Sequence, residues 1–409
     1  MANTTSRRKY EDILDVVYAS EFANVEIDFG DDHYQGLEVR EQFEVACSAC
    51  YRVVKTCECI GILRGVELQH VRFMSENPRA NFANLNTVHL HPQFNSRIVE
   101  PISWPKYLRN FHFGDGFNSS IVNFSWPNSL QRIEFGVRFN FSIANVTWPT
   151  ELDTVSFGGF FNQPLNDVAW PSKLKTISLG FGFRHPLQNA QWPRGLENII
   201  FKRGGGLGGR GFNHDIVGVD WPYDLRTIDF GDSFNQPLTK VSWPNNLQTI
   251  DLGEAFNQPI GNVKWPSSLR TIIFGSNFDQ PIATVAWPDN LQTIEFGFSF
   301  NQPIADVSWP TSLLSIKFDW EFNQPIADVS WPTSLRSIEF GQDFNQPIDS
   351  VTWPSQLQSI VFGEHVKQIQ GVQWPRVTKI IGTTFQGYMY TVSEPVVSTD
   401  HQRTFDVRA

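Results

Sequence analysis

The chain has 409 residues, of which 41% are hydrophobic and 18% are charged, so a largely disordered chain is excluded. Its formal net charge of -10 argues against nucleic acid or an anionic membrane as the main partner. The 14 Trp, 35 Phe, 25 Pro and 29 Gly, against 3 Met, indicate many copies of one short aromatic motif rather than an enzyme fold.

Residues 1–83 differ from the rest of the chain and form the first expected domain. The apolar residues Phe43, Cys47, Cys50, Val54 and Cys57 share one face of a helix. We expect a small mixed N-terminal cap with a helical segment, because the open end of a stack of repeats needs a cover. Its cysteines are interpreted as reduced, buried thiols rather than a zinc site, since no secretory signal is recognised and a cytoplasmic location is expected.

A repeat of 22 residues fills the second expected domain, residues 84–375. Thirteen Trp-Pro pairs mark it, ten of their twelve intervals are 22 residues, and only Trp320 stands outside the series. The unit reads L-x-x-I-x-F-G-x-x-F-N-Q-P-I-x-x-V-x-W-P-x-S and is clearest from Leu225 to Gln358. The period predicts about thirteen stacked turns, since one unit is too small to fold alone.

Within residues 291–296 of one unit, the apolar Ile294 and Phe296 alternate with the polar Thr293 and Glu295, which predicts a half-buried strand. Gly297 ends that strand and is expected to adopt a positive φ. Val307 to Trp309 predicts a second, very short strand, and the prolines leave no room for a helix. Seven apolar side chains per unit should point inward. The predicted fold is therefore an all-β repeat, either leucine-rich-repeat-like or a β-solenoid.

Two side-chain rows are expected to tie the turns together. Each Trp of a Trp-Pro pair is predicted to be buried, with its indole N–H bonded to a neighbouring turn. The Asn of the Phe-Asn-Gln-Pro motif is predicted to form an internal ladder whose amides satisfy backbone groups of adjacent turns. A binding row of polar groups is the alternative. The Asn positions are 118, 140, 162, 213, 235, 257, 301, 323 and 345, with Asp279 as the exception.

One interval is 29 residues long and contains a glycine-rich basic loop near residues 202–211. A G-x-G-x-x-G match from Gly204 to Gly209 is not followed by a helix, which argues against a dinucleotide site. The loop is interpreted as a flexible insertion. The alternative is a mobile basic finger that touches an acidic or phosphorylated partner through Lys202, Arg203 and Arg210. The third expected domain, residues 376–409, loses the repeat and is predicted to hold a closing strand and a loose tail.

The repeat unit resembles the FNIP (IP22) repeat, a 22-residue relative of leucine-rich repeats, over about residues 85–375. The resemblance implies a protein-interaction scaffold, found in protists and their large DNA viruses, often behind an N-terminal F-box or kinase domain. If the protein is viral, its location would be the virion or the host cytoplasm.

The leading hypothesis is a non-enzymatic scaffold that binds protein through the exposed face of its long strands. Candidate binding residues are a hydroxyl row, Thr227, Thr249, Thr271 and Thr293, and an acidic row, Glu134, Asp229, Asp251, Glu295 and Glu339, which Lys317 interrupts. The acidic row favours a basic partner. An ordinary solvated face is the alternative for these rows. An assembly component, for example of a viral particle, and an F-box-type adaptor are the alternative functions.

No catalytic residues, cofactor or metal are expected, and no nucleic-acid or membrane partner; the oligomeric state stays open. His89, His91 and His112 fall on one face of neighbouring strands, where three imidazoles could meet a metal. No carboxylate at ligand spacing completes that set, so a polar surface cluster is favoured.

Overall fold

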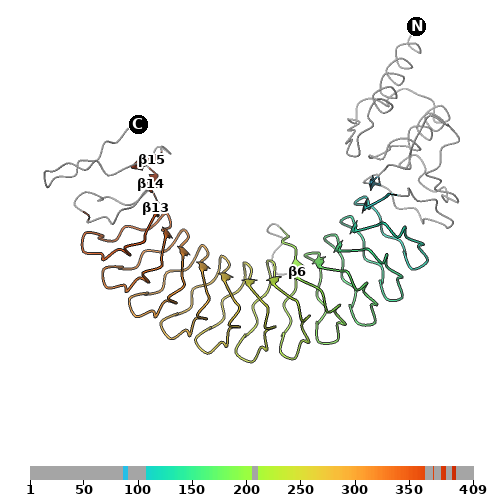
Figure 1. Cartoon of the computed structure of the whole chain (residues 1–409), viewed down its shortest axis with the longest axis horizontal. Coiled ribbons are helices and arrows are strands. Elements are labelled where there is room, and N and C mark those ends of the chain that lie inside the picture. The colour runs from blue at the N-terminus through green and yellow to red at the C-terminus, as the bar shows by residue number, and fades with distance from the viewer. Residues whose placement is uncertain are drawn as a thin grey trace, which may run out of the picture. The chain divides into compact units, whose positions relative to one another are not determined.

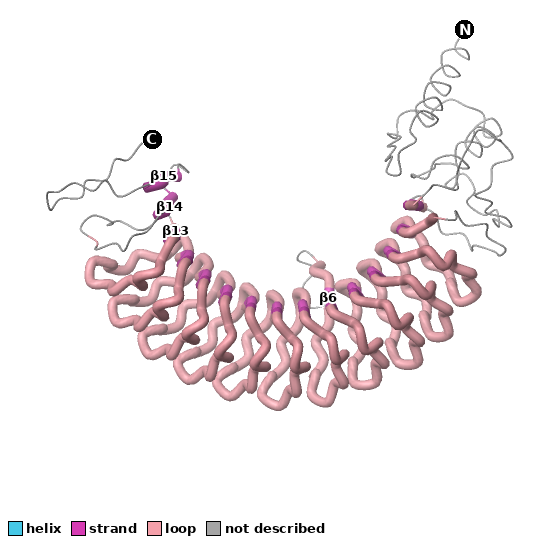
Figure 2. Tube along the Cα trace, viewed as in Figure 1, coloured by secondary structure: helices cyan, strands magenta, loops and turns pink. Residues whose placement is uncertain are grey.

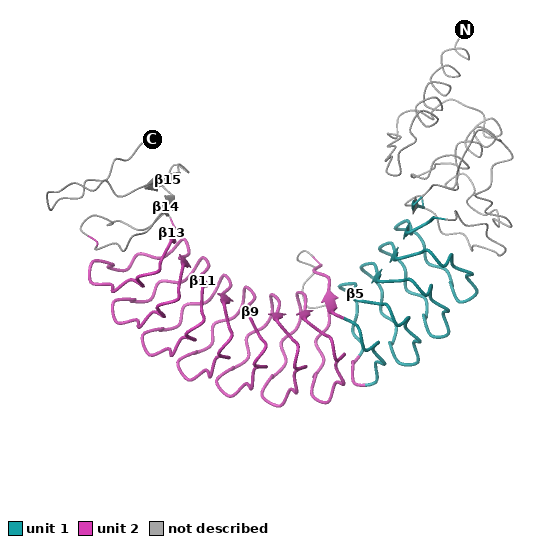
Figure 3. Ribbon diagram, viewed as in Figure 1, with its two compact units in different colours: residues 1–185, 189–196 teal, residues 186–188, 197–409 magenta. Residues whose placement is uncertain are grey.

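The structure is a computed structural model, and it describes residues 86–90, 107–204, 211–363, 372, 379–383 and 389–392 (Figure 1). The expected cap at residues 1–83, with its helix and its cysteines, lies outside the described residues, as do His91, Arg210 and most of residues 364–378. The chain divides into two compact units (Figure 3). Unit 1 comprises residues 1–185 and 189–196, and unit 2 comprises residues 186–188 and 197–409.

Each repeat contributes one short strand to the sheet. The strands of unit 1 are β1 (Thr87–His89), β2 (Asn110–His112), β3 (Arg132–Glu134), β4 (Thr154–Ser156) and β5 (Thr176–Leu179). The strands of unit 2 are β6 (Asn198–Phe201), β7 (Thr227–Asp229), β8 (Thr249–Asp251), β9 (Thr271–Ile273), β10 (Thr293–Glu295), β11 (Ser315–Lys317), β12 (Ser337–Glu339), β13 (Ser359–Phe362), β14 (Lys379–Thr383) and β15 (Met389–Val392). Strands β1 to β13 each precede one Trp-Pro pair, which matches the predicted turns.

Neighbouring strands pair in parallel and in register, so equivalent residues of successive units lie side by side. In unit 1 this holds from β1 to β5. In unit 2, Ile294 of β10 lies opposite Ile272 of β9 and Ile316 of β11. Strand β15 is antiparallel to β14 and follows it directly in the chain. The all-β repeat fold predicted from the period is confirmed.

Tight turns make up the rest of each unit (Figure 2). In the unit of β10, backbone hydrogen bonds run from Phe300 N to Gly297 O (3.3 Å) and from Val307 N to Ile304 O (3.3 Å). A third runs from Leu313 N to Pro310 O (3.1 Å). These are β-turn bonds, and the second of them uses the amide that a strand would need. The predicted strand at 307–309 is therefore wrong, whereas the described residues contain no helix, as the prolines led us to expect.

The seven predicted inward side chains form the core. In the unit of β10 they are Leu291, Ile294, Phe296, Phe300, Ile304, Val307 and Trp309, and all are buried. Equivalent phenylalanines stack from turn to turn, with ring centroids 6.0 Å apart for Phe278 and Phe300 and 6.1 Å apart for Phe300 and Phe322. The core is thus a set of continuous side-chain columns, and no unit buries its apolar face without its neighbours.

The tryptophans of the Trp-Pro pairs also stack, as Trp287 and Trp309 do at 6.4 Å. Most of those described are buried, and Trp126, Trp170, Trp192 and Trp265 are half-buried. The predicted indole hydrogen bond is wrong. The Nε1 atoms of Trp148, Trp170, Trp192, Trp221, Trp243, Trp265, Trp287, Trp309 and Trp331 are buried without a partner. An unpaired buried N–H costs about 1–3 kcal/mol, and ring burial and stacking offset it.

The asparagine ladder exists and bonds successive turns. Asn301 Oδ1 accepts a hydrogen bond from Asn323 N (3.0 Å) and another from Gln324 Nε2 (2.9 Å). The same backbone bond recurs from Asn345 N to Asn323 Oδ1 (3.0 Å). The predicted role is confirmed, but the side chains are half-buried or exposed rather than internal. The ladder therefore lies on the surface of the stack.

The glycine that follows most of the strands is needed for close approach, and in two turns it also has a positive φ. A Cβ at Gly297 would lie 2.1 Å from the carbonyl oxygen of Gly275 in the preceding turn. Of these glycines only Gly231 and Gly253, with φ of 70° and 79°, have a positive φ. We call this row the rim glycines: Gly114, Gly136, Gly158, Gly180, Gly231, Gly253, Gly275, Gly297, Gly341 and Gly363.

Candidate binding surface

The outward face of the strands in unit 2 carries two rows of side chains, at the first and third positions of each strand. The magenta turns of Figure 3 place these strands on the concave side of the unit. Alternate residues of a strand point to opposite faces, so the middle residue enters the core and the flanking two face outward. Both outward rows are half-buried. The rows are therefore accessible, but less exposed than the sequence suggested.

The hydroxyl row is continuous from β7 to β13. It consists of Thr227, Thr249, Thr271, Thr293, Ser315, Ser337 and Ser359. Each member lies directly opposite the next on the neighbouring strand. Parallel strands lie about 4.8 Å apart, so the row places one hydroxyl per strand at that spacing.

The expected acidic row is interrupted in several places. On β7 to β12 its positions hold Asp229, Asp251, Ile273, Glu295, Lys317 and Glu339. Glu134 lies on β3 of unit 1, where its Oε2 is 2.8 Å from Nδ1 of His112. The stripe that the sequence suggested is thus a set of separate groups.

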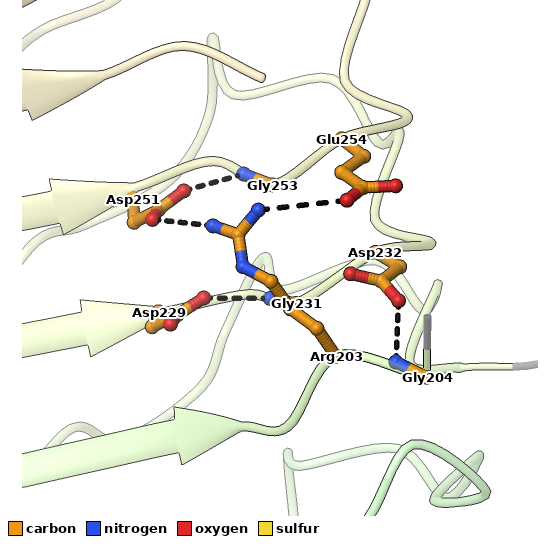
Figure 4. Close-up of polar contacts among 8 residues, drawn as sticks. All are labelled: Arg203, Gly204, Asp229, Gly231, Asp232, Asp251, Gly253 and Glu254. Atoms are coloured by element: carbon orange, nitrogen blue, oxygen red, sulfur yellow. Dashed lines mark hydrogen bonds and ion pairs between the residues drawn. The ribbon is translucent and has the colours of Figure 1, made fainter. Parts of the chain in front are cut away.

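Arg203, in the segment after β6, contacts the acids of β8 and its turn (Figure 4). Its Nη2 donates to Asp251 Oδ2 at 2.6 Å, and its Nη1 lies 3.9 Å from Glu254 Oε1. Burial lowers the pKa of Arg203, but the charges of Asp251 and Asp229 outweigh burial and raise it. The Asp251 side chain keeps only 14% of its surface exposed. The chain itself therefore covers this part of the acidic row.

Asp229 and Asp251 also hold the backbone of the following turns. Asp229 Oδ1 accepts from Gly231 N at 2.9 Å, and Asp251 Oδ1 accepts from Gly253 N at 3.0 Å. These two glycines are the rim glycines with a positive φ, so the aspartates fix an unusual turn. Burial, and then the charge of Asp251, raises the pKa of Asp229 above its ordinary value. Both aspartates have a structural role that the sequence did not indicate.

Hydrogen bonds hold the basic insertion at both of its described ends. Gly204 N donates to Asp232 Oδ2 (2.5 Å), and Gly211 N donates to Ser233 Oγ (2.9 Å). Phe201 and Phe212 flank the insertion and stack with ring centroids 4.4 Å apart. Lys202 is half-buried, and Arg210 lies outside the described residues. The interpretation of Arg203 as a group held out toward an acidic partner does not fit, since its guanidinium contacts acids of its own chain.

Lys317 lies among three carboxylates at the other end of the acidic row. Its Nζ is 3.1 Å from Glu339 Oε1. Burial lowers the pKa of Lys317, but the hydrogen bond to Glu339 and the charges of Glu339, Asp319 and Glu295 outweigh it and raise the pKa. The balance of charge around β10 to β12 is therefore negative, although a lysine sits at the centre.

The expected histidine cluster forms only in part within the described residues. The rings of His89 and His112 stack with centroids 4.1 Å apart. Among the residues that the structure describes, no group of three or more His, Cys, Asp or Glu side chains is placed to hold a metal ion. None of the described residues belongs to a helix long and apolar enough to cross a bilayer.

Two exposed aromatic residues on the rim after β10 and β11 were missed as a candidate site. Phe298 is 42% exposed and Trp320 is 47% exposed. Both occupy the position directly after the rim-glycine position, and their rings stack at 5.8 Å. The available signal was the register, because Trp320 is the tryptophan outside the Trp-Pro series.

Comparisons with known proteins agree with the fold. The FNIP repeat model matches residues 212–255, 256–299, 300–343 and 322–365, and the BspA-type leucine-rich repeat region model matches residues 107–201. The structure of CroV588, described as a novel circular LRR protein, is 30% identical with a TM-score of 0.58. The match covers 74% of this chain and 50% of that one, so this chain spans half the length of CroV588.

A second match, to an internalin (inlF) from Listeria monocytogenes, is 12% identical with a TM-score of 0.36 and covers 81% of this chain and 90% of that one. No curated protein matches the chain. Residues 212–365 are FNIP repeats, and the repeat region as a whole is a leucine-rich-repeat-like solenoid.

Proposed function

We propose that the chain is a non-enzymatic repeat scaffold that binds a protein partner through the outward strand face of unit 2. The observation that carries this proposal is the unbroken hydroxyl row from β7 to β13. Seven strands at about 4.8 Å present hydroxyls over roughly 29 Å, a length suited to a protein surface rather than to a small molecule.

The rigidity of this face supports the same function. Parallel pairing joins the strands from β7 to β13. The asparagine ladder, with Asp279 as one member, and the column of phenylalanines from Phe234 to Phe344 join the turns that follow β7 to β12. A partner that docks on such a face orders few side chains of the scaffold, which lowers the entropic cost of association. Because leucine-rich-repeat-like scaffolds commonly mediate protein interactions, the fold is consistent with this role.

Substitution of two members of the hydroxyl row tests the proposal. Thr249→Arg with Thr293→Arg places two long cations on β8 and β10 and leaves Thr271 between them. The matched control is Ser308→Arg with Thr352→Arg, two exposed hydroxyl residues outside the strands with the same separation in sequence. We expect proteins retained by the unmodified chain and by the control to be lost from the strand variant, as measured by affinity capture and mass spectrometry. Equal retention by both variants would overturn the proposal.

A further inference from the structure

The rim after β10 and β11 carries a stacked aromatic pair, Phe298 and Trp320, that the fold does not require. Their ring planes are inclined by 20°, and each side chain leaves more than 40% of its surface exposed. The corresponding positions in the other described turns of unit 2 hold the polar residues Asp232, Glu254, Ser276 and Gln342. Stacking of the turns therefore does not call for an aromatic side chain here.

A second departure from the repeat falls on the same turn. Asp319 stands where the neighbouring turns have the rim glycines Gly297 and Gly341. Its Oδ1 accepts a hydrogen bond from Trp320 N at 2.8 Å. Since the rim glycines exist because the turns approach closely, an aspartate at this position is not explained by packing. Asp319 instead places a carboxylate beside the aromatic pair.

Backbone bonds between turns hold the pair in position. Glu321 N donates to Phe298 O and Asp343 N donates to Trp320 O, both at 2.9 Å. These bonds also set the acidic residues Glu321 and Asp343 next to the two rings. The aromatic pair is thus presented on fixed backbone, and little of it needs ordering when a partner binds.

The charges near the pair select the kind of partner. Asp319, Glu321 and Asp343 lie on the rim, and Glu295 and Glu339 lie on the strands that lead to it. The one lysine among them, Lys317, is paired with Glu339. An exposed aromatic face flanked by carboxylates matches a guanidinium or ammonium group, which stacks on the ring and pairs with the acids. The same carboxylates repel phosphate groups.

We propose that Phe298 and Trp320, with Asp319 and Glu321, form an anchor site for an arginine- or lysine-bearing segment of a protein partner. The inference rests on the proposed function and names the chemistry of the partner. The acidic row suggested that a basic partner binds the strand face, including β7 and β8. In this proposal the basic segment binds at the rim after β10 and β11 instead.

The test uses the full chain and a labelled peptide in which arginine alternates with glycine. Fluorescence anisotropy should show binding that weakens as salt rises, because exposed ion pairs are screened. Phe298→Ala with Trp320→Ala should weaken binding by about tenfold or more. Phe160→Ala is the matched control, since Phe160 is an exposed rim aromatic of unit 1, 52% exposed and in edge contact with Phe181, and it should bind as the unmodified chain does.

A charge variant keeps the proposal falsifiable if the double alanine variant does not fold. Glu321→Lys leaves both rings in place and should also weaken binding of the arginine peptide. A peptide in which glutamate alternates with glycine should not bind. Equal affinity for the arginine peptide with and without the aromatic pair would overturn the inference. So would binding of neutral oligosaccharides but not of the peptide, or self-association of the chain that Trp320→Ala abolishes in the absence of peptide binding.

Two comparisons separate this inference from the proposed function. If Thr249→Arg with Thr293→Arg loses its protein partner while the aromatic variant keeps both partner and peptide, the anchor site is wrong and the strand face stands. If the aromatic variant loses partner and peptide while the strand variant keeps them, the anchor site stands and the strand face is wrong.

Discussion

The acidic residues of two parts of unit 2 differ in what surrounds them. At β7 and β8, Asp229 and Asp251 bond to the rim glycines, and Arg203 pairs with Asp251. At β10 and β11, Asp319 and Glu321 flank an exposed aromatic pair. The residue types are the same, and Asp319 also accepts a backbone bond, from Trp320 N. The difference is that Arg203 covers Asp251 in the first group, whereas the second group lies beside two exposed rings. A row of like charges read from a repeat therefore has no single role, because each member takes its role from the turn that it occupies.

The largest expected contrast is between two tryptophans. Trp287→Ala should lower the free energy of unfolding by about 3–5 kcal/mol, since it leaves a cavity in a buried column. Trp320→Ala should change it by less than about 0.5 kcal/mol, because that side chain lies on the surface. Denaturant unfolding of both variants measures the difference. A large loss of stability in Trp320→Ala would mean that the rim after β11 is structural, and the contrast between the two tryptophans would be wrong.

A smaller contrast is expected between the two groups of acids. Asp229→Lys with Asp251→Lys removes two turn bonds and places two ammonium groups beside Arg203, so it should cost about 2–4 kcal/mol. Glu295→Lys should stay within about 0.5 kcal/mol. Thermal unfolding in parallel with the unmodified chain measures both. If the double variant were as stable as Glu295→Lys, the acids of β7 and β8 would have no structural role.

Stability should also depend on pH through Asp229. Because burial and Asp251 raise its pKa in the folded state, the folded protein binds this proton more tightly than the unfolded chain does. The free energy of unfolding therefore rises as pH falls through the raised pKa of Asp229. This rise is complete below the ordinary pKa of 3.8, where the carboxyl is protonated in both states. Asp229→Asn removes the gain and can still accept the Gly231 bond.

The measurement compares the unfolding midpoints of the unmodified chain and of Asp229→Asn across this pH range. The stability of the unmodified chain relative to the variant should increase as pH falls. A difference that is flat, or of opposite sign, contradicts the assignment. Groups that do not interact with Asp229 cancel in the comparison, whereas Asp251, Asp232 and Arg203 are coupled to it.

The smallest expected effect is that of Lys317→Ala. The pair with Glu339 is 42% exposed on both sides, so its loss should cost about 0.2–1 kcal/mol and less at high salt. The same substitution removes the positive charge beside the anchor site. It should therefore strengthen binding of the arginine peptide while stability changes little, which separates the two quantities in one variant.

Periodicity made the interior predictable. Ile294, Phe300 and Trp309 recur with their neighbours every 22 residues, and burial of a recurring apolar position follows from its pattern alone. The asparagine ladder was predictable for the same reason. The second strand was predicted wrongly because Val307 N bonds to Ile304 O within its own turn. The alternation of apolar and polar side chains does not indicate which acceptor a backbone amide takes.

The surface was much less predictable. Arg203 and Asp251 are 48 residues apart, and their pairing depends on the path of the insertion rather than on the period. The indole N–H groups were expected to find partners because buried donors usually do, yet those of nine tryptophans from Trp148 to Trp331 have none. The anchor site was visible only as a defect in the repeat, since Trp320 and Asp319 break its pattern.

The stacking of Phe201 on Phe212 has a consequence for engineering. These rings are separated by 11 positions in the chain, whereas Phe230 and Phe234, which stack at 4.2 Å, are separated by four. Seven extra residues thus enter the rim while the column of rings beneath stays continuous. A foreign peptide grafted between equivalent phenylalanines of another unit, such as Phe274 and Phe278, would be displayed from the rim, and the chain could carry one such loop on each of several turns.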